Sequence, residues 1–330
     1  MENRRILLTG GTGSFGRKFV SLTLAQKNPA KIIIFSRDEM KQWEMAQQFE
    51  HDPRIQFIIG DVRDKERLMQ VVPGADYIVH AAATKIVPTA EYHPSECIKT
   101  NIIGAMNVID AAVECNIARV VALSTDKASN PINLYGATKL ASDKLFVASN
   151  REDENSTRFA VVRYGNVMGS RGSVIPFFVN QARHGVLPIT HPSMTRFMIS
   201  LEEGVGLVWK AFYDMQGGEI YVKKIPSMTI TDIAKAVSPE AELKIIGIRP
   251  GEKIHEQMIG VEDAPFTYQY DGYYKILPAL NNWSEDPKRI GKGTPVPEQF
   301  SYTSDNNSEW MTTDELQAWM KQNASQIGYI

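Results

Sequence analysis

The chain has 330 residues, of which 43% are hydrophobic and 22% charged, and its formal net charge is −2 at pH 7. This composition is typical of water-soluble globular proteins, and the length suggests about two domains. A chain without a basic excess is a poor candidate for nucleic-acid binding, and Cys97 and Cys115 are too few for a disulfide framework. With no apolar signal core at its start and no apolar run long enough to cross a bilayer, we expect a cytoplasmic protein with no membrane partner.

The first half of the chain alternates short β-rich runs with longer amphipathic segments. The predicted strands are residues 5–9, 31–35, 55–59, 76–80, 119–123 and 158–163. The predicted helices between them are residues 14–26, 38–50, 64–71, 94–115 and 134–148. These strands are continuous apolar runs, which is typical of parallel strands covered on both faces. We therefore predict an α/β fold whose residues 1–165 form a Rossmann-type, doubly wound parallel sheet.

The rhythm of strand and helix breaks after Asn166, where glycines and prolines separate shorter elements. We expect residues 166–330 to form a smaller α/β substrate-binding region that interleaves with the first domain at the carboxyl edge of the sheet, where such folds bind ligands. Residues 281–299 are polar and proline-containing, which predicts a loop. Residues 312–322 predict a last helix, capped by Thr312 or Thr313.

A glycine-rich turn follows the first predicted strand and opens the first helix. The segment Thr9-Gly-Gly-Thr-Gly-Ser-Phe-Gly16 fits both G-x-G-x-x-G and G-x-x-G-x-x-G. Glycines at these positions let backbone amides approach a pyrophosphate at a helix N-terminus. An ordinary glycine-rich turn is the alternative, but the strand-to-helix context favours a dinucleotide site. The candidate contacts are Gly10, Thr12, Gly13, Ser14, Phe15 and Gly16.

The end of the second predicted strand indicates which dinucleotide binds. Ser36, Arg37 and Lys41 offer a hydroxyl and two cations, which suit the 2′-phosphate of NADP. Asp38 is the opposing feature, because an acid turned inward would favour NAD, and a solvated helix start is the alternative for both cations. Further along the chain, Asp61 and Val62 are placed to meet the adenine ring, while small residues let the cofactor lie close at Ala81, Ala82 and Ala83.

Tyr135 and Lys139 form a Y-x-x-x-K motif on the helix after the fifth predicted strand. Residues four apart share one helix face, so the cation is expected to lower the tyrosine pKa and make it a usable base. The motif is common by chance, and a surface pair is the alternative. Its place in a nucleotide fold favours a catalytic role, with Ser124 or Thr125 donating to a substrate oxygen.

Together these motifs resemble the extended short-chain dehydrogenases/reductases, and among them the nucleotide-sugar 4,6-dehydratases. The most similar group is the inverting, 5-epimerising UDP-N-acetylglucosamine 4,6-dehydratases of pseudaminic acid biosynthesis. The resemblance spans nearly the whole chain, through HAAATKIVPTAEYHP from His80, LSTDKASNPINLYGATKLASDKLF from Leu123, RYGNVMGSRGSVIPFF from Arg163, MTRF from Met194, IPSM from Ile225, GIRPGEKIHE from Gly247 and the tail motif from Tyr302.

The resemblance implies an NADP-dependent lyase that oxidises C4 of the sugar, eliminates water across C5 and C6, returns the hydride to C6 and inverts C5. Retaining 4,6-dehydratases carry glutamate where this chain has Lys127. The implied roles place Thr125 beside the substrate, Tyr135 as the base for the C4 hydroxyl, Lys127 as the base for C5 and Asp126 as the acid for the leaving hydroxyl. We expect burial to keep Lys127 neutral and Asp126 protonated. A salt link that caps a loop is the alternative for the acidic and basic pair.

The resemblance also implies the side chains that bind the sugar nucleotide. The candidates are Lys85, Thr125, Asn166, Arg171, Ser173, Thr190, Arg196, Arg249 and Glu252. Guanidinium groups suit diphosphate oxygens. The alternative for each of these residues is an ordinary surface charge, and for Arg196 the sequence supports the two interpretations about equally. The segment Thr190 to Met194 departs from the family pattern, which has an acid soon after the threonine.

Two activities and one class of binding protein compete with this interpretation. A retaining dehydratase or a UDP-sugar epimerase would use the same fold, and a non-catalytic NADP-sensing protein is the third alternative. By resemblance we expect a homo-oligomer that pairs through residues 94–115 and 134–148, no metal, and a product that serves glycosylation of flagellin, capsule or O-antigen.

Overall fold

The structure is a computed structural model that describes residues 1–151 and 156–327. Its first half alternates strands and helices as the sequence predicts. The elements are β1 (Arg5–Thr9), α1 (Ser14–Gln26), β2 (Lys31–Ser36), α2 (Glu39–Gln48), β3 (Ile55–Ile59), α3 (Lys65–Val71), β4 (Tyr77–His80), α4 (Val87–Tyr92), α5 (Pro94–Ile98), η1 (Lys99–Ile103), α6 (Gly104–Glu114), β5 (Arg119–Leu123), η2 (Asp126–Ala128), α7 (Leu134–Ala148) and β6 (Arg158–Arg163). The single helix expected over residues 94–115 is divided by η1, a π-helical turn.

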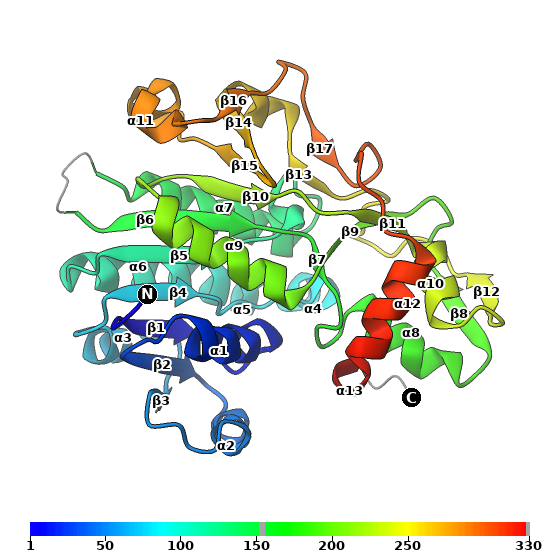
Figure 1. Ribbon diagram of the computed structural model, residues 1–330, viewed down its shortest axis with the longest axis horizontal. Helices are drawn as coiled ribbons and strands as arrows, with labels where there is room; N and C mark the ends of the chain where they lie inside the picture. Colours follow the sequence, from blue (N-terminus) through cyan, green and yellow to red (C-terminus); the bar gives the residue numbers. More distant parts are fainter. Residues whose placement is uncertain (152–155, 328–330) are drawn as a thin grey trace.

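Ten strands of the described chain form one large sheet, in the order β16-β14-β15-β10-β6-β5-β4-β1-β2-β3 (Figure 1). The neighbours from β3 to β10 (Ile220–Lys223) all pair in parallel. The apolar runs explain this centre, because consecutive residues such as Leu7 and Leu8 or Ile33 and Ile34 are all buried.

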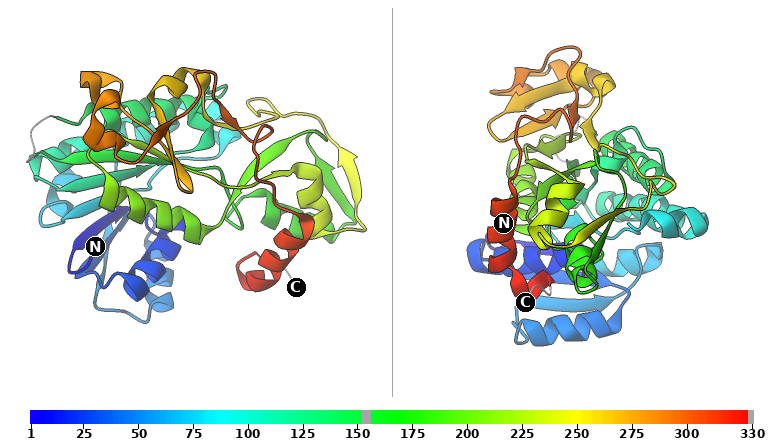
Figure 2. Two further views of the ribbon diagram at one scale, coloured as in Figure 1. Left: turned by 45° about the horizontal axis from the view of Figure 1, so that its top comes forward. Right: turned by 90° about the vertical axis from the view of Figure 1, so that its right-hand side faces the viewer.

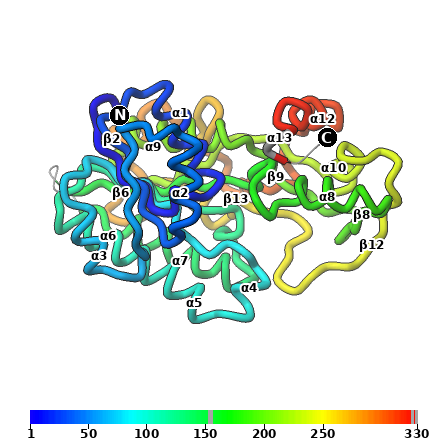
Figure 3. The backbone as a smooth tube through the Cα atoms, turned by 90° about the horizontal axis from the view of Figure 1, so that it is seen from below, coloured from blue at the N-terminus to red at the C-terminus, as the bar shows by residue number. Residues whose placement is uncertain are grey.

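Helices cover both faces of the sheet, which confirms the doubly wound fold. On one face α1 packs against α9 (Leu201–Asp214), and on the other α6 lies between α3 and α7 (Figure 3). The carboxyl ends of the central strands point toward the side of the molecule that holds α8 (Val174–Ala182) and α12 (Thr313–Gln322) (Figure 1). The loops that follow these strands therefore face that side.

The second half of the chain contributes to two places in the molecule. Part of it forms a smaller region with its own apolar core beside the sheet (Figure 2). Its elements are β7 (Asn166–Val167), α8 (Val174–Ala182), β8 (Val186–Ile189), β9 (Thr195–Ile199), β11 (Ser227–Thr229), α10 (Ile230–Val237), β12 (Glu242–Ile245), α12 (Thr313–Gln322) and α13 (Ala324–Ile327). The rest returns to the large sheet as β10, β14 (Thr267–Tyr270), β15 (Tyr273–Ile276) and β16 (Thr294–Pro295). The strand and helix pattern therefore changes after residue 165, but the residues that follow contribute both to the large sheet and to the smaller region.

The loop predicted over residues 281–299 is only partly a loop. It contains η4 (Leu280–Glu285), α11 (Pro287–Ile290) and β16. Pro287 is tolerated because it occupies the first turn of α11, where a backbone N–H has no helical partner. The last helix agrees with its prediction, since Thr312 and Glu315 form a capping box at the start of α12. Among the described residues, no helix is long and apolar enough to cross a membrane.

Candidate active site

A cleft of about 730 Å³ opens at the carboxyl ends of the central strands and extends toward the smaller region. It brings together all the predicted site residues except Thr190 and Arg196. Those that line it are Gly10, Thr12, Gly13, Ser14, Phe15, Gly16, Ser36, Arg37, Lys41, Asp61, Val62, Ala81, Ala82, Ala83, Lys85, Thr125, Asp126, Lys127, Tyr135, Lys139, Asn166, Arg171, Ser173, Arg249 and Glu252.

The glycine loop at one end of the cleft has the geometry of a dinucleotide cradle. Gly10 has φ +68°, and a Cβ there would lie 2.8 Å from the backbone of Ala82. A Cβ on Gly16 would lie 2.1 Å from the carbonyl oxygen of Gly11. Gly13 is the N-cap of α1 and, as a glycine, offers no side-chain oxygen to the first turn. The loop therefore fits a pyrophosphate, which would bind the amides of this turn.

The side chains that follow β2 leave cations at the rim of the cleft. The Asp38 carboxylate caps α2 by accepting from the backbone N–H of Lys41 at 3.0 Å, and it pairs with Lys41 Nζ at 2.6 Å. Arg37 pairs with Asp61 at 3.5 Å while 57% of its side chain stays exposed. Asp38 is thus engaged at the helix start, and Arg37 is accessible beside Ser36.

A cluster of charged side chains lies beneath the middle of the cleft, just after β5. Lys127 Nζ donates to Oδ1 of Asp126 at 3.0 Å and lies 3.1 Å from Oε1 of Glu256. The Thr125 hydroxyl donates to the same Oδ1 of Asp126 at 2.9 Å. Asp126 and Glu256 are almost completely buried, whereas 24% of the Lys127 side chain is exposed. Lys127 and Asp126 therefore both line the cleft, whereas Glu256 contacts the lysine from outside it.

The environment sets the ionisation of this cluster. Burial raises the pKa of Asp126, with a further contribution from the Glu256 charge, while Lys127 lowers it. The protonated acid stays a prediction. The expectation that burial keeps Lys127 neutral is wrong. Burial lowers the pKa of Lys127, but the carboxylates of Asp126 and Glu256 outweigh it, and the pKa lies well above its ordinary value. Sequence reasoning missed the second carboxylate.

Tyr135 and Lys139 both line the cleft from α7. Lys139 Nζ donates to the carbonyl oxygen of Leu123 at 2.7 Å, which fixes the ammonium at the end of β5. The predicted lowering of the Tyr135 pKa is wrong for the protein alone, because burial raises it to about 12 despite the opposing effect of Lys127. The Ser124 hydroxyl donates to Asp143 at 2.7 Å, so of the two candidate donors Thr125 is the one that borders the acid.

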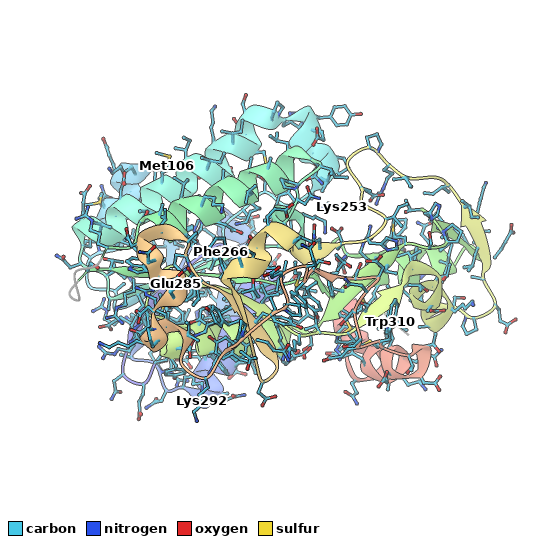
Figure 4. All side chains as sticks on the ribbon, turned by 90° about the horizontal axis from the view of Figure 1, so that it is seen from above. Met106, Lys253, Phe266, Glu285, Lys292 and Trp310 are labelled. Atoms are coloured by element: carbon cyan, nitrogen blue, oxygen red, sulfur yellow. The ribbon has the colours of Figure 1, made fainter. Side chains whose placement is uncertain are left out.

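The far end of the cleft is bordered by the loop of residues 247–256, which carries Arg249 and Glu252. These two side chains form an ion pair, and Oε2 of Glu252 is buried without a hydrogen-bond partner in the described chain. The loop is fixed to the helix that carries Tyr135, since Asn133 Nδ2 donates to the carbonyl oxygen of Gly251 at 2.7 Å. Lys253, labelled in Figure 4, donates to the carbonyl oxygen of Ser129 at 2.7 Å.

A second loop joins the two ends of the cleft. The backbone N–H of Arg171 donates to Oγ of Ser14 at 3.3 Å, and Lys85 Nζ donates to the carbonyl oxygen of Arg171 at 3.1 Å. Oδ1 of Asn166 and Oγ of Ser173 are buried beside it and have no hydrogen-bond partner among the described residues. These groups are available to a bound molecule.

Two predicted contacts lie outside the cleft. Arg196 is buried and donates to the carbonyl oxygens of Thr195, Ile254 and Lys253 at 2.7, 3.0 and 3.0 Å. Its guanidinium therefore supports the loop of residues 247–256, instead of lying free for a diphosphate. Thr190 follows β8 and does not border the cleft, so its assignment as a substrate contact stays a prediction without a supporting position.

The sequence of the chain is similar to enzymes that act on nucleotide sugars, according to the names of its relatives. Residues 6–278 match the family model described as polysaccharide biosynthesis protein. The UDP-N-acetylglucosamine 4,6-dehydratase (inverting) of Campylobacter jejuni is 55% identical over 323 residues, which are 96% of each chain. The UDP-glucose 4-epimerase of Rickettsia canadensis is 44% identical over 83% of each chain.

A solved structure of lower sequence identity has the same fold. The dTDP-glucose 4,6-dehydratase of Streptomyces venezuelae, solved with NAD bound, superposes with a TM-score of 0.72 over 97% of this chain and 98% of the other, at 22% identity.

Proposed function

The chain belongs to the family of polysaccharide biosynthesis proteins, and within it we propose that this protein is an inverting UDP-N-acetylglucosamine 4,6-dehydratase. The observation that carries the proposal is the ion pair of the buried Asp126 with Lys127, beside Tyr135 in the cleft that begins at the glycine loop. An oxidation at C4 alone needs only the tyrosine. An elimination of water requires an acid and a base in addition, and Asp126 and Lys127 would supply them.

The proposed reaction is that of a hydro-lyase, and its product would be UDP-2-acetamido-2,6-dideoxy-β-L-arabino-hex-4-ulose. When bound, NADP supplies the hydride acceptor that later becomes the hydride donor. Tyr135 accepts the proton of the C4 hydroxyl, Lys127 removes the C5 proton, and Asp126 donates to the C6 oxygen that leaves as water. Thr125 orients Asp126 through its hydrogen bond at 2.9 Å. Inversion at C5 makes the product suitable for pseudaminic acid biosynthesis.

An incubation in deuterated water tests the proposal against its competitors. Wild-type protein, with its copurified cofactor and UDP-N-acetylglucosamine, is expected to give a 4-keto-6-deoxy sugar with deuterium at C5 and inverted C5, followed by NMR. Loss of water with C5 retained would indicate a retaining dehydratase. An intact sugar inverted at C4 would indicate an epimerase, the activity named for the Rickettsia relative. No change in the sugar would support a non-catalytic NADP-sensing protein.

NADP is the proposed cofactor because Arg37 and Lys41 line the cleft, while the carboxylate of Asp38, which lines it too, is engaged in capping α2. We expect Arg37→Ala to weaken NADP(H) binding by about 10- to 100-fold, the value of one or two charge-assisted hydrogen bonds. Affinity for NAD(H) is expected to stay unchanged. Titration of the free protein with both cofactors measures this, with Arg4→Ala at an exposed ion pair as control. Equal or tighter binding of NAD(H) by the wild-type chain would refute the proposal.

The cytoplasmic location and the homo-oligomer belong to the same proposal. Size-exclusion chromatography with light scattering measures the second directly.

A further inference from the structure

Glu256 lies directly behind the proposed base, at the end of the loop of residues 247–256. Its Oε1 atom is 3.1 Å from Lys127 Nζ, and the residue is only 2% exposed. It does not border the cleft, so it can influence a bound sugar only through another side chain. That side chain is Lys127, whose ammonium group it shares with Asp126.

Segments distant in the sequence hold Glu256 in this position. Its backbone N–H donates to Oγ of Ser304 at 2.9 Å, and its carbonyl accepts from the Ser304 N–H at 2.8 Å. Oγ of Ser304 lies 2.6 Å from Oγ1 of Thr195. The adjacent Arg196 brings its Nε within 3.8 Å of Oε1 of Glu256. The backbone of Glu256 is therefore held by Ser304, while its carboxyl group contacts Lys127 and Arg196 through Oε1.

In the cluster of Asp126, Lys127 and Glu256, one proton can lie on either of two atoms, Nζ of Lys127 or Oε1 of Glu256. With Asp126 as the proton donor of the proposed reaction, Lys127 and Glu256 form the remaining ion pair, and these three side chains together have no net charge. Transfer of a proton from Nζ to Oε1 breaks an N–H bond and forms an O–H bond. It yields a neutral amine and a neutral carboxylic acid, and the net charge stays zero. In a buried site the ion pair bears a desolvation cost that the neutral pair avoids, which brings the two states closer in free energy.

We infer that Glu256 is a positioning residue of the dehydration, which holds Lys127 toward the substrate and takes its ammonium proton. The inference rests on the proposed function. The freed amine then accepts the C5 proton, and the electron pair of the C5–H bond forms the double bond to C6. The C6–O bond breaks as Asp126 gives its proton to the departing oxygen, and water leaves. This arrangement explains how a lysine whose ammonium form is stabilised can act as a base.

The substitution Glu256→Gln tests this role, because it removes the proton acceptor and keeps the shape. We expect kcat to fall about 100-fold or more, within the range for general acid–base catalysis, and KM to change by less than about threefold. The kinetic isotope effect with substrate deuterated at C5 is expected to rise, since removal of this proton becomes the slowest step. Glu256→Asp is expected to restore part of the activity.

Glu262→Gln is the matched control, since Glu262 is an exposed glutamate nearby in the chain, within η3 (Val261–Phe266). It is expected to match the wild type in rate and isotope effect. UDP binding by calorimetry and the thermal unfolding midpoint show whether each variant is folded.

Two results would overturn the inference. The first is a wild-type kcat in Glu256→Gln. The second is a loss of both rate and UDP binding in that variant with an isotope effect like that of the wild type, which would show that the ion pair is only structural. If Glu256→Gln does not fold, Glu256→Asp decides, since an unchanged isotope effect at reduced rate would overturn the inference and a raised one would support it. Failure of the proposed function is distinct, because the wild-type chain itself would then leave UDP-N-acetylglucosamine intact.

Discussion

Replacing Lys127 with alanine is expected to abolish dehydration while NADP(H) binding survives. Lys127 lies after β5 and contacts Asp126 and Glu256, whereas the pyrophosphate cradle is formed by the turn between β1 and α1. Loss of a general base costs about 100- to 10,000-fold in rate. NMR of the sugar product measures the rate, and titration with NADPH measures the cofactor site. Full activity in this variant would remove Lys127 from the mechanism.

The same substitution also has an expected effect on stability. Without the ammonium of Lys127, the buried carboxylate of Glu256 loses its nearest cation and keeps only Arg196 at 3.8 Å and the charge of Lys253, so its folded-state pKa is expected to rise above the unfolded value. Its contribution to stability is then present below the unfolded pKa and lost as the pH rises through the folded one. We expect Lys127→Ala to unfold at a lower temperature than the wild type. This difference in unfolding temperature is expected to be larger near about pH 8 than near about pH 5, which is close to the ordinary carboxyl pKa. Lys144→Ala, at an exposed position of α7, is the control for removal of a lysine.

Gly16→Ala is expected to destroy the cofactor site. An added methyl group would lie 2.1 Å from the Gly11 carbonyl oxygen and 2.5 Å from its carbon, and neither atom belongs to a flexible side chain. The first turn of α1 must therefore move away from the loop, which removes the amides from the pyrophosphate. We expect NADP(H) affinity to fall at least about 100-fold, equivalent to about 2.7 kcal/mol, and activity to fall with it.

Gly206→Ala provides the matched control for the glycine loop. Gly206 lies within α9, and a Cβ there meets no atom within 4 Å. Alanine at a helix interior is better than glycine by about 1 kcal/mol, so this variant is expected to keep cofactor binding and gain stability. Wild-type NADP(H) affinity in Gly16→Ala would show that the loop does not bind the pyrophosphate as proposed.

The parts of the fold that depend on local pattern could be predicted from the sequence. The apolar runs of β1, β2 and β5 and the glycine turn before α1 are sufficient for a doubly wound sheet. The antiparallel strands β14 and β15 are short and contain aromatic and polar residues, so the pairing of β15 with β10 and of β14 with β15 gives no local signal. The sequence therefore predicts the parallel centre of the sheet but not its antiparallel edge.

The same limit applies to the chemistry of the site. Y-x-x-x-K and the Thr125-Asp-Lys127 triplet are visible because their members are close in the chain. Glu256 could not be assigned to Lys127, since only the packing of the loop of residues 247–256 brings them together. The predicted direction of the Lys127 pKa shift was wrong because two carboxylates, Asp126 and then Glu256, outweigh burial, and the sequence does not show the position of the second. The motif from Gly247 includes Glu256, so the available signal was its membership of that motif.

The bond between Ser304 and Glu256 has a consequence for the order in which the enzyme becomes competent during translation. The glycine turn, Tyr135 and Lys139 leave the ribosome with the first half of the chain, and their strands can pair with one another in parallel as they emerge. The carboxyl partner of Lys127 is fixed only after Ser304 has been made and the strand that precedes it, β17 (Tyr302–Thr303), has paired with β13 (Gln257–Ile259). A nascent chain thus acquires the means to hold a nucleotide before Lys127 acquires its partner Glu256, so the proposed elimination requires synthesis at least as far as Ser304.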